Sequence, residues 1–309
     1  MRVLVTGGTG YLGRAVVQAL AANGHHPVVF ARSASKSGLP GSAIDGDVRD
    51  VDALGRAADG CDAICHLAAL VSLWQPRRAD FDDVNVGGLR NVLAAAEGRH
   101  VPRIVYTSSF LARAPRGREL PMEANDYQRT KVAADRLATA AAGSGRPLIR
   151  LYPGVVYGPG ELREGNLVGR LIDDHLKGRL PGLIGADRPW SYAWIEDVAA
   201  AHVAAVERAV PGSAYALGGV NVPQMRVFEI VRSIRGTRLP RRIPFPLARL
   251  IGAAEDARAA IFRSPPLLTA GTVEIFREDW SLDSSDAASD LGLRVRPLEE
   301  GVAALLSTL

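Results

Sequence analysis

The stretch Val3–Leu20, VLVTGGTGYLGRAVVQAL, joins a short apolar run, a glycine-rich turn and the start of an amphipathic helix. Two glycine spacings overlap in it, Gly8-x-Gly10-x-x-Gly13 and Gly7-x-x-Gly10-x-x-Gly13. Glycines at these spacings permit a tight turn and let backbone N–H groups approach a pyrophosphate at the positive end of a helix. Because the turn follows the first strand and opens the first helix, it predicts a dinucleotide site rather than a ligand-free turn.

Apolar runs and helical patterns alternate through the first half of the chain. The predicted strands are 2–6, 27–31, 61–67, 103–109 and 147–152, and the predicted helices between them are 11–23, 80–98 and 127–142. A further helix at 196–209 and a strand at 213–217 are expected to return to the same sheet. Strands that alternate with helices and are apolar throughout are typical of a parallel sheet covered on both faces. We expect an α/β fold, a doubly wound parallel Rossmann sheet with a smaller, mostly helical C-terminal substrate lobe.

The alternation loosens after about residue 157, where glycines and prolines punctuate the chain. The expected division gives a dinucleotide-binding Rossmann domain at 1–156 plus about 190–220. The substrate-binding lobe is then 157–189 plus 221–309.

The composition is that of an ordinary globular protein, with 47% hydrophobic and 23% charged residues and a formal net charge of +4. The arginines form no long block and no run with aromatics, which disfavours nucleic acid binding. No apolar run reaches about 18 residues, so we expect no membrane partner.

A strand pattern that starts at Arg2 leaves no room for a signal peptide. The only cysteines, Cys61 and Cys65, are expected to be inert thiols in the core. We expect a cytoplasmic protein. The scattered histidines predict no metal site.

The end of the second predicted strand, VVFARS, indicates which dinucleotide is bound. An acidic residue about 20 residues after the glycines would hydrogen-bond a ribose 2′-hydroxyl and select NAD. Here Ala31, Arg32 and Ser33 end the strand, and no acid follows the glycines before Asp45. A guanidinium at position 32 can pair with a 2′-phosphate or stack on adenine, and a solvated arginine is the competing interpretation. We expect NADP as cofactor, with NAD as the alternative.

The stretch Asp126–Lys131, DYQRTK, places a tyrosine and a lysine four residues apart, on one face of a helix. Only three of the 37 Lys and Arg residues are lysines, so a lysine at 131 indicates a requirement that arginine does not meet. An ammonium, together with an oxidised nicotinamide, stabilises a phenolate, lowers the tyrosine pKa and suits Tyr127 to proton transfer. An ordinary surface pair is the competing interpretation.

The segment YTSS at 106–109 ends a predicted strand, where ligands bind in open parallel sheets. A serine hydroxyl there can hydrogen-bond a substrate oxygen. We expect Ser109 to do so, with Ser108 as the second choice. A serine nucleophile is disfavoured, because the sequence has no nucleophile elbow and no Ser-His-Asp set.

Several of these motifs occur together in the order and spacing of one family. They are TGGTGYLG, GDVRD, HLAA, NVGGLRNVLAAA, YTSS, YQRTK and LYPGVVYGPG, and WIEDVAAAHVAAVE, YALGG and PLEEGV extend the match to nearly the whole chain. The chain resembles an extended short-chain dehydrogenase/reductase of the NAD-dependent epimerase/dehydratase superfamily. HLAALVSLW and the terminal helices look most like the dihydroflavonol-reductase and 3β-hydroxysteroid-dehydrogenase-like branch.

The resemblance implies a role for each matched position. Ser109, Tyr127 and Lys131 would form the catalytic set. The cofactor would be held by Gly7, Thr9, Gly10, Tyr11, Leu12, Gly13, Arg32, Ser33, Asp47, Val48, Leu67, Ala68, Ala69, Tyr127, Lys131 and Pro153. Among these, Asp47 and Val48 would contact the adenine, residues 67–69 would line the nicotinamide ribose, and Pro153 would lie by the nicotinamide. Asn85 would brace the site, with a water to Lys131 as one route.

Two departures from the family pattern bear on the substrate. Only 17 residues separate Ser109 from Tyr127, fewer than expected for sugar-nucleotide enzymes. The loop after the serine, FLARAPRGREL, also lacks the Asp-Glu pair that a sugar-nucleotide dehydratase would need. Arg113, Arg116 and Arg118 in this loop could steer an anionic substrate, although a solvated loop is favoured.

Aromatic residues and two helices complete the expectations. Trp190 and Trp194 are expected in the core, whereas Trp74 and Tyr192 are candidate substrate contacts. The helices at 80–98 and 127–142 are expected to pair across a homodimer, with intramolecular packing as the alternative.

Three functions remain open on these grounds. The first is an NADPH-dependent oxidoreductase that reduces the ketone or aldehyde of a small organic substrate, with Tyr127 as proton donor. The alternative is an NAD-dependent nucleotide-sugar epimerase that retains its cofactor. A non-catalytic NADP-sensing module ranks third, because such relatives usually lack the tyrosine or the lysine that this chain has.

Overall fold

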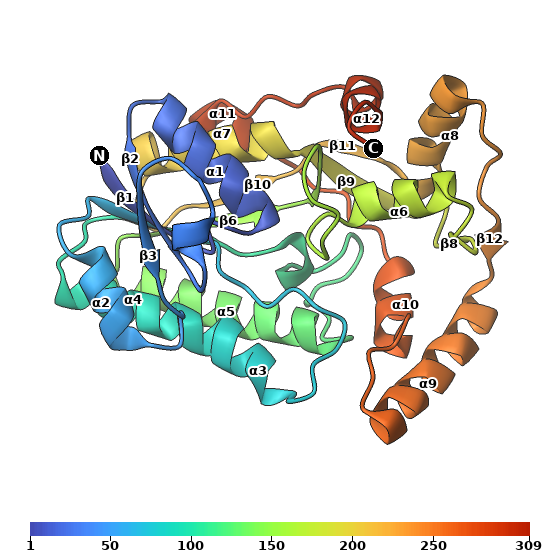
Figure 1. Cartoon of the computed structure of the whole chain (residues 1–309), viewed down its shortest axis with the longest axis horizontal. Coiled ribbons are helices and arrows are strands. Elements are labelled where there is room, and N and C mark those ends of the chain that lie inside the picture. Colours follow the sequence, from blue (N-terminus) through green and yellow to red (C-terminus); the bar gives the residue numbers. More distant parts are fainter.

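Seven parallel strands form the central sheet of the computed structural model, which describes residues 1–309 (Figure 1). The strands are β1 (Arg2–Thr6), β2 (His26–Ala31), β3 (Ser42–Asp45), β4 (Ala63–His66), β5 (Ile104–Thr107), β6 (Leu148–Pro153) and β10 (Ala214–Leu217). Their order is β10-β6-β5-β4-β1-β2-β3, so the direction of winding reverses between β1 and β4. A ligand crevice is expected at such a reversal.

Helices cover both faces of the sheet (Figure 1). One layer contains α1 (Tyr11–Ala22), α7 (Ile195–Arg208) and α11 (Ser285–Leu291), and the other contains α2 (Val51–Ala58), α4 (Gly88–Gly98) and α5 (Asp126–Gly143). The middle residues of β1 are apolar because both faces of the strand are buried. Val3 and Val5 lie in the core on the side of α1 and α7, whereas Leu4 lies in the core on the other face of the sheet, with α2 and α4. The predicted doubly wound parallel sheet is therefore confirmed, because both faces of its strands are buried.

Some elements differ from the sequence-based prediction. Strand β3 and helix α2 were not predicted; β3 is a four-residue strand with an alternating, half-buried pattern. Cys61 lies before β4, which begins at Ala63, so it is not a strand residue; it is nevertheless buried and unpaired, like Cys65. The predicted helix at 80–98 is divided into α3 (Ala79–Asp82), a π-helical turn η2 (Asp83–Gly87) and α4.

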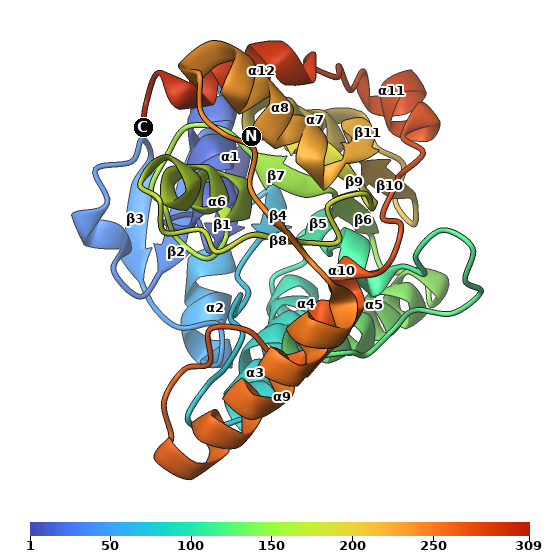
Figure 2. The same ribbon diagram turned by 90° about the vertical axis from the view of Figure 1, so that its right-hand side faces the viewer.

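The remaining elements gather at one end of the sheet (Figures 1 and 2). They are the helices α6 (Leu167–Leu176), α8 (Gln224–Arg235), α9 (Phe245–Phe262), α10 (Ala270–Phe276) and α12 (Leu298–Leu306), the strands β7 (Val155–Tyr157), β9 (Pro189–Trp194) and β11 (Val220–Pro223), and the strand pair β8 (Leu183–Ile184) and β12 (Arg242–Ile243). Short 3-10 turns occur at η1 (Ala34–Lys36) and η3 (Phe110–Ala112).

Between α6 and α8 the chain returns to the central sheet, where α7 packs on α1 and β10 pairs with β6. The end lobe has its own core, which contains Trp190, Trp194, Phe228 and Trp280. The boundaries of the two domains stay a prediction. No helix in the structure combines the length and the apolarity needed to span a bilayer.

Candidate functional site

All of the predicted site positions lie near one edge of the sheet. The strands are parallel and in register, with Thr6 opposite Phe30 and His66, so their carboxyl ends lie side by side. The glycine turn follows β1, Arg32 follows β2, the segment 67–69 follows β4, the two serines follow β5 and Pro153 ends β6. Parallel pairing therefore gathers residues that are far apart in sequence at one edge of the sheet, where a ligand crevice is expected.

The glycine turn requires its glycines for steric reasons. Gly7 has a φ of 70°, and a Cβ there would lie 2.6 Å from the backbone nitrogen of Ala68. A Cβ on Gly13 would lie 2.1 Å from the carbonyl oxygen of Gly7. Both contacts are with backbone, which cannot move aside as a flexible side chain could. The glycines thus hold the turn, the start of α1 and the segment after β4 in close contact.

Helix α1 begins at Tyr11 without a side-chain cap, because its N-cap residue is Gly10. The first N–H groups of a helix have no intrahelical partner, and together with the helix dipole they attract an anion. The Tyr11 hydroxyl donates a hydrogen bond of 2.9 Å to the carbonyl of Gly158, which ties the segment after β7 to this helix start. The arrangement fits a dinucleotide pyrophosphate at the glycine turn.

Charged residues at the ends of β2 and β3 would meet the adenosine half of a bound dinucleotide. Arg32 is exposed and makes no ion pair. The Asp45 carboxylate accepts hydrogen bonds from the backbone nitrogen and hydroxyl of Ser35, at 2.8 and 2.7 Å. Asp47 is paired with Arg49 at 2.7 Å, and this pairing is the main reason that its pKa lies below the usual range. Both acids at this edge are therefore already engaged within the protein, whereas the guanidinium of Arg32 is free.

The structure separates the two adjacent serines after β5. Ser109 caps η3, its hydroxyl accepts from the backbone nitrogen of Leu111 at 3.2 Å, and the proximity of this hydroxyl lowers the pKa of the Tyr127 phenol. The Ser108 hydroxyl donates instead to the carboxylate of Asp135 at 2.9 Å. Both serines are buried. Ser109, the first choice from the sequence, is therefore the serine brought to the tyrosine.

Tyr127 lies in the first turn of α5 and is half-buried. Burial raises the pKa of its phenol to about 12, and the hydrogen bond with Ser109 opposes that rise. The phenol is therefore protonated at neutral pH, the form that can donate a proton. The lowering of this pKa by Lys131 together with an oxidised nicotinamide stays a prediction.

Lys131 is 3% exposed, and its ammonium donates a hydrogen bond of 2.9 Å to the carbonyl of Thr107. It also lies 5.2 Å from the centre of the Tyr106 ring. Burial lowers the pKa of Lys131 to about 8, and the negative charge of Asp135 opposes that shift. Burying a lysine charge is energetically costly. The burial of Lys131 one helical turn after Tyr127 therefore argues against an ordinary surface pair of these two side chains.

Asp135 was missed in the sequence, although it lies four residues after Lys131 and eight after Tyr127, on the same face of α5. It accepts from Ser108 and is hydrogen-bonded to Tyr152 of β6. Burial raises its pKa, and these hydrogen bonds oppose the rise. The i, i+4, i+8 row of tyrosine, lysine and aspartate was the sequence signal that could have identified it.

Asn85, in the π-helical turn η2, is 3% exposed. Its side-chain oxygen accepts from the backbone nitrogen of Leu70 at 2.7 Å, and its amide donates to the Thr130 hydroxyl at 2.9 Å. It therefore ties the segment after β4 to α5, beside Lys131. A link from Asn85 to Lys131 through a water stays a prediction.

His66, at the end of β4, behaves as a packed residue. Its Nδ1 lies 2.7 Å from the Thr6 hydroxyl, and its ring stacks on Tyr106 with centroids 5.8 Å apart. Burial, with a further contribution from the positive charge of Lys131, lowers its pKa to about 3. His66 is therefore neutral at any ordinary pH.

Other candidates are not brought into the crevice as free groups. Arg118 is paired with Glu278 at 2.6 Å, and the Arg113 guanidinium lies 5.3 Å from the centre of the Tyr152 ring. Tyr192 is buried against Tyr157 in the core of the end lobe, so it does not present an open surface to a substrate. Trp74, in the loop after β4, is half-buried.

Comparison with known proteins agrees with this geometry. The sequence model described as the NAD dependent epimerase/dehydratase family matches residues 3–218. The chain is 31% identical to Sterol demethylase protein B of Methylococcus capsulatus over 310 residues, which cover 95% of this chain and 93% of that protein. It is 31% identical over 324 residues to the 3 beta-hydroxysteroid dehydrogenase/Delta 5-->4-isomerase of Mycobacterium tuberculosis, covering 94% of this chain and 85% of that protein.

A solved structure, MoeE5 in complex with UDP-glucuronic acid and NAD, has the same fold with a TM-score of 0.78. It is 26% identical, and the superposition covers 100% of this chain and 98% of that chain. The fold, the glycine turn and the relatives therefore agree on one type of protein, an NAD(P)-dependent oxidoreductase or epimerase.

Proposed function

Because this chain belongs to the NAD dependent epimerase/dehydratase family, as an extended short-chain dehydrogenase/reductase, we propose that it is an NADPH-dependent reductase of a ketone or aldehyde on a small organic substrate. The observation that carries the proposal is the grouping of Ser109, Tyr127 and Lys131 at the end of β5, on the same edge of the sheet as the glycine turn after β1. The relatives of comparable length include a steroid dehydrogenase, which supports an alcohol or carbonyl as the reacting group.

The residues around the crevice fit a dinucleotide. The uncapped start of α1 would hold the pyrophosphate, and Asp47 and Val48 would lie by the adenine. Arg32 would meet a 2′-phosphate, because it is exposed and unpaired while Asp45 is engaged by Ser35. When bound, the nicotinamide supplies the hydride for the substrate carbonyl.

Each polar residue has a distinct proposed task. Tyr127 donates its phenolic proton to the substrate oxygen, and its raised pKa keeps that proton in place at neutral pH until charge develops on the oxygen. Ser109 is positioned to hydrogen-bond the same oxygen. Lys131 supplies a compact ammonium that can reach a ribose hydroxyl, and Asp135 keeps a negative charge near it.

Titration calorimetry and a carbonyl-reduction assay test the proposal. We expect NADPH to bind at least about tenfold more tightly than NADH, since the 2′-phosphate gains a charge-assisted pair. Tyr127→Phe should lower kcat by about 100-fold or more while NADPH affinity changes little, because only the proton donor is lost. Tighter binding of NADH, or full turnover in Tyr127→Phe, would contradict the proposal.

A nucleotide-sugar epimerase is the second candidate, and the likeness to MoeE5 with UDP-glucuronic acid favours it. An epimerase must keep its dinucleotide through the cycle, so the purified protein would carry stoichiometric NAD. Against it stands the short loop of 17 residues between Ser109 and Tyr127. Mass spectrometry of the cofactor released on denaturation distinguishes the two functions.

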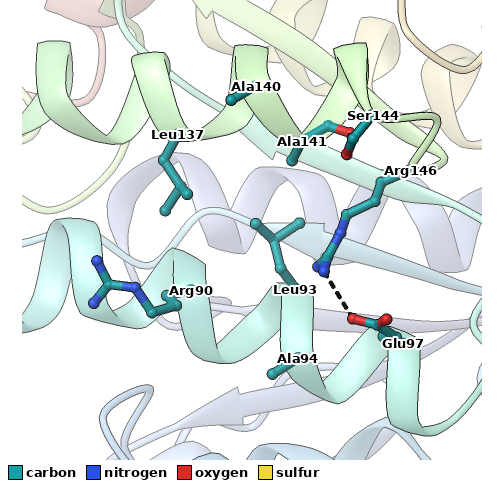
Figure 3. Close-up of a pocket in the computed structure, with 9 residues that line it drawn as sticks. All are labelled: Arg90, Leu93, Ala94, Glu97, Leu137, Ala140, Ala141, Ser144 and Arg146. Carbon is teal, nitrogen blue, oxygen red and sulfur yellow. Dashed lines mark hydrogen bonds and ion pairs between the residues drawn. The ribbon is translucent and has the colours of Figure 1, made fainter.

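We also propose that the chain forms a homodimer through the outer faces of α4 and α5. A shallow groove of about 360 Å³ runs between these helices, toward the end of α5 opposite Tyr127 (Figure 3). Small alanine side chains and two leucines form its floor, and Arg146 pairs with Glu97 at one end at 2.8 Å. The residues that line it are Arg90, Leu93, Ala94, Glu97, Leu137, Ala140, Ala141, Ser144 and Arg146.

The mass in solution tests this dimer. We expect light scattering to give twice the chain mass of 32.8 kDa, and Ala140→Arg to shift it toward the single chain because a large charged side chain would fill the groove. A wild-type protein that is monomeric at micromolar concentration would contradict it.

A further inference from the structure

Helix α9 and the loop after it present a row of large apolar side chains to solvent. The exposed fractions are Leu247 50%, Leu250 68%, Ile251 43%, Ile261 73%, Phe262 71% and Leu267 87%. Exposed apolar residues of this size scattered singly need no explanation, but a continuous group marks an interaction surface. In both views α9 is an outer element that projects from the body of the molecule (Figures 1 and 2).

Five of these side chains share one side of α9. At 3.6 residues per turn, Leu250, Ile251, Ile261 and Phe262 fall within roughly 60° of Leu247 around the helix axis, with Arg258 between the two groups, and Leu267 lies in the loop after the helix. The opposite side is packed: Ala248, Gly252 and Ala259 are buried, and a Cβ on Gly252 would lie 2.7 Å from the backbone nitrogen of Ala270. The helix is therefore held by α10 on its inner side and leaves its apolar side uncovered.

The charged residues around this apolar face are mostly positive. Residues 238–263 contain six arginines and only two acids, Glu255 and Asp256. Both acids are engaged inside the lobe: Glu255 binds Arg258 at 2.9 Å and the backbone nitrogen of Leu267 at 2.8 Å, and Asp256 accepts from the backbone nitrogen of Ala270 at 3.0 Å. Arg238 and Arg241 before the helix and Arg263 after it form no ion pair. Unpaired cations therefore flank the apolar face at both ends.

We propose that the apolar face of α9 binds the surface of a membrane that contains anionic lipids. An apolar helix side with guanidinium groups at its ends matches acyl chains beneath a layer of negative headgroups. A second copy of the chain is the weaker fit. An 18-residue helix offers roughly 27 Å by 10 Å, about 270 Å², well below the about 800 Å² per partner of a stable interface.

The expectation of no membrane partner considered only spanning helices, and this proposal departs from it. The inference does not depend on the proposed reaction, but α9 lies close to the helix that carries Tyr127. Helix α10 lies between α9 and the start of α5, where the side chain of Asn125 donates to the Thr272 hydroxyl at 3.3 Å. A membrane-bound α9 thus places the chain's end lobe, next to Tyr127, at the lipid surface.

Vesicle flotation of the full chain tests the proposal. We expect the wild type to float with vesicles of phosphatidylcholine containing about one third phosphatidylserine, and to be released by high salt. Leu250→Glu/Ile261→Glu should reduce the bound fraction by about tenfold. The matched control is Val210→Glu/Leu120→Glu, because those side chains are 68% and 76% exposed elsewhere on the surface.

A second variant separates charge from apolar contact. Arg241→Gln/Arg263→Gln should weaken binding to the anionic vesicles and remove its salt dependence, without any change in the packed side of α9. Absence of wild-type flotation, or equal losses in the α9 variant and its control, would overturn the proposal. So would a light-scattering mass that falls in Leu250→Glu/Ile261→Glu relative to wild type, which would assign the face to a second copy.

Discussion

Replacing Lys131 with methionine is expected to make the folded protein more stable at neutral pH while removing its activity. Lys131 is 3% exposed, and burial lowers the pKa of its ammonium to about 8. Such a group destabilises the folded state, because the unfolded chain solvates the same charge in water. Methionine has a similar length and no charge, so it fills the space without that cost.

The magnitude follows from the two pKa values. The difference between about 8 and the ordinary value of 10.5 corresponds to roughly 3 kcal/mol at pH 7. The variant also loses the hydrogen bond from the ammonium to the carbonyl of Thr107, which costs about 1 kcal/mol. The net increase in the free energy of unfolding is therefore about 2 kcal/mol.

The gain in stability has a definite pH dependence. Below pH 8 the lysine is protonated in both the folded and the unfolded chain, so its full destabilisation is present. Between about pH 8 and 10.5 the folded protein loses the proton while the unfolded chain keeps it, and the wild type gains stability as pH rises. The advantage of Lys131→Met should therefore shrink across this window and be largely lost near pH 10.

Urea unfolding followed by tryptophan fluorescence, at pH 7 and pH 10, measures this difference. The control is Lys177→Met, whose side chain is 54% exposed in an ion pair with Asp173 and should change stability by less than about 1 kcal/mol at either pH. In parallel, kcat/KM of Lys131→Met should fall by about 100-fold or more. A variant that is less stable than wild type at pH 7, or whose advantage is the same at both pH values, would refute the argument.

Four further substitutions test the site. Gly13→Ala places a Cβ 2.1 Å from a backbone carbonyl and should weaken dinucleotide binding by about 100-fold in calorimetry, whereas Gly143→Ala, whose Cβ meets open space, should not. Ser109→Ala should lower kcat by about 10- to 100-fold with little change in the urea midpoint. Ser108→Ala should instead reduce the free energy of unfolding by about 1–2 kcal/mol, because a buried carboxylate loses its donor. Arg32→Ala should raise the Kd for NADPH by about tenfold and leave that for NADH unchanged.

The outcomes that would contradict these predictions are specific. Normal dinucleotide affinity in Gly13→Ala would show that the turn can relax. A larger loss of turnover in Ser108→Ala than in Ser109→Ala would reverse the assignment of the two serines. An equal loss of NADPH and NADH affinity in Arg32→Ala would mean that this arginine stacks on the adenine instead of pairing with a 2′-phosphate.

Local patterns in the sequence determined the architecture of this protein. The apolar runs and the glycine spacing around Gly10 depend on backbone geometry within a few residues, so they predicted the strands, the turn and the start of α1. Parallel pairing then places all strand ends at one edge, which is why the candidate site residues could be expected together. Strand β3 was missed because it alternates half-buried and exposed positions and lacks the continuous apolar run of the equally short β4, and the eight residues of α2 hold little helical pattern.

The tertiary structure decided what local pattern could not. Ser108 and Ser109 are adjacent in sequence, and only the packing of α5 and β6 directs one to Asp135 and the other to Tyr127. The burial that sets the pKa of Lys131 comes from elements distant in the chain. The apolar side of α9 has the same periodicity as a core-facing helix. Whether such a side is covered depends on what packs against it, and that is a property of the folded whole and not of the segment.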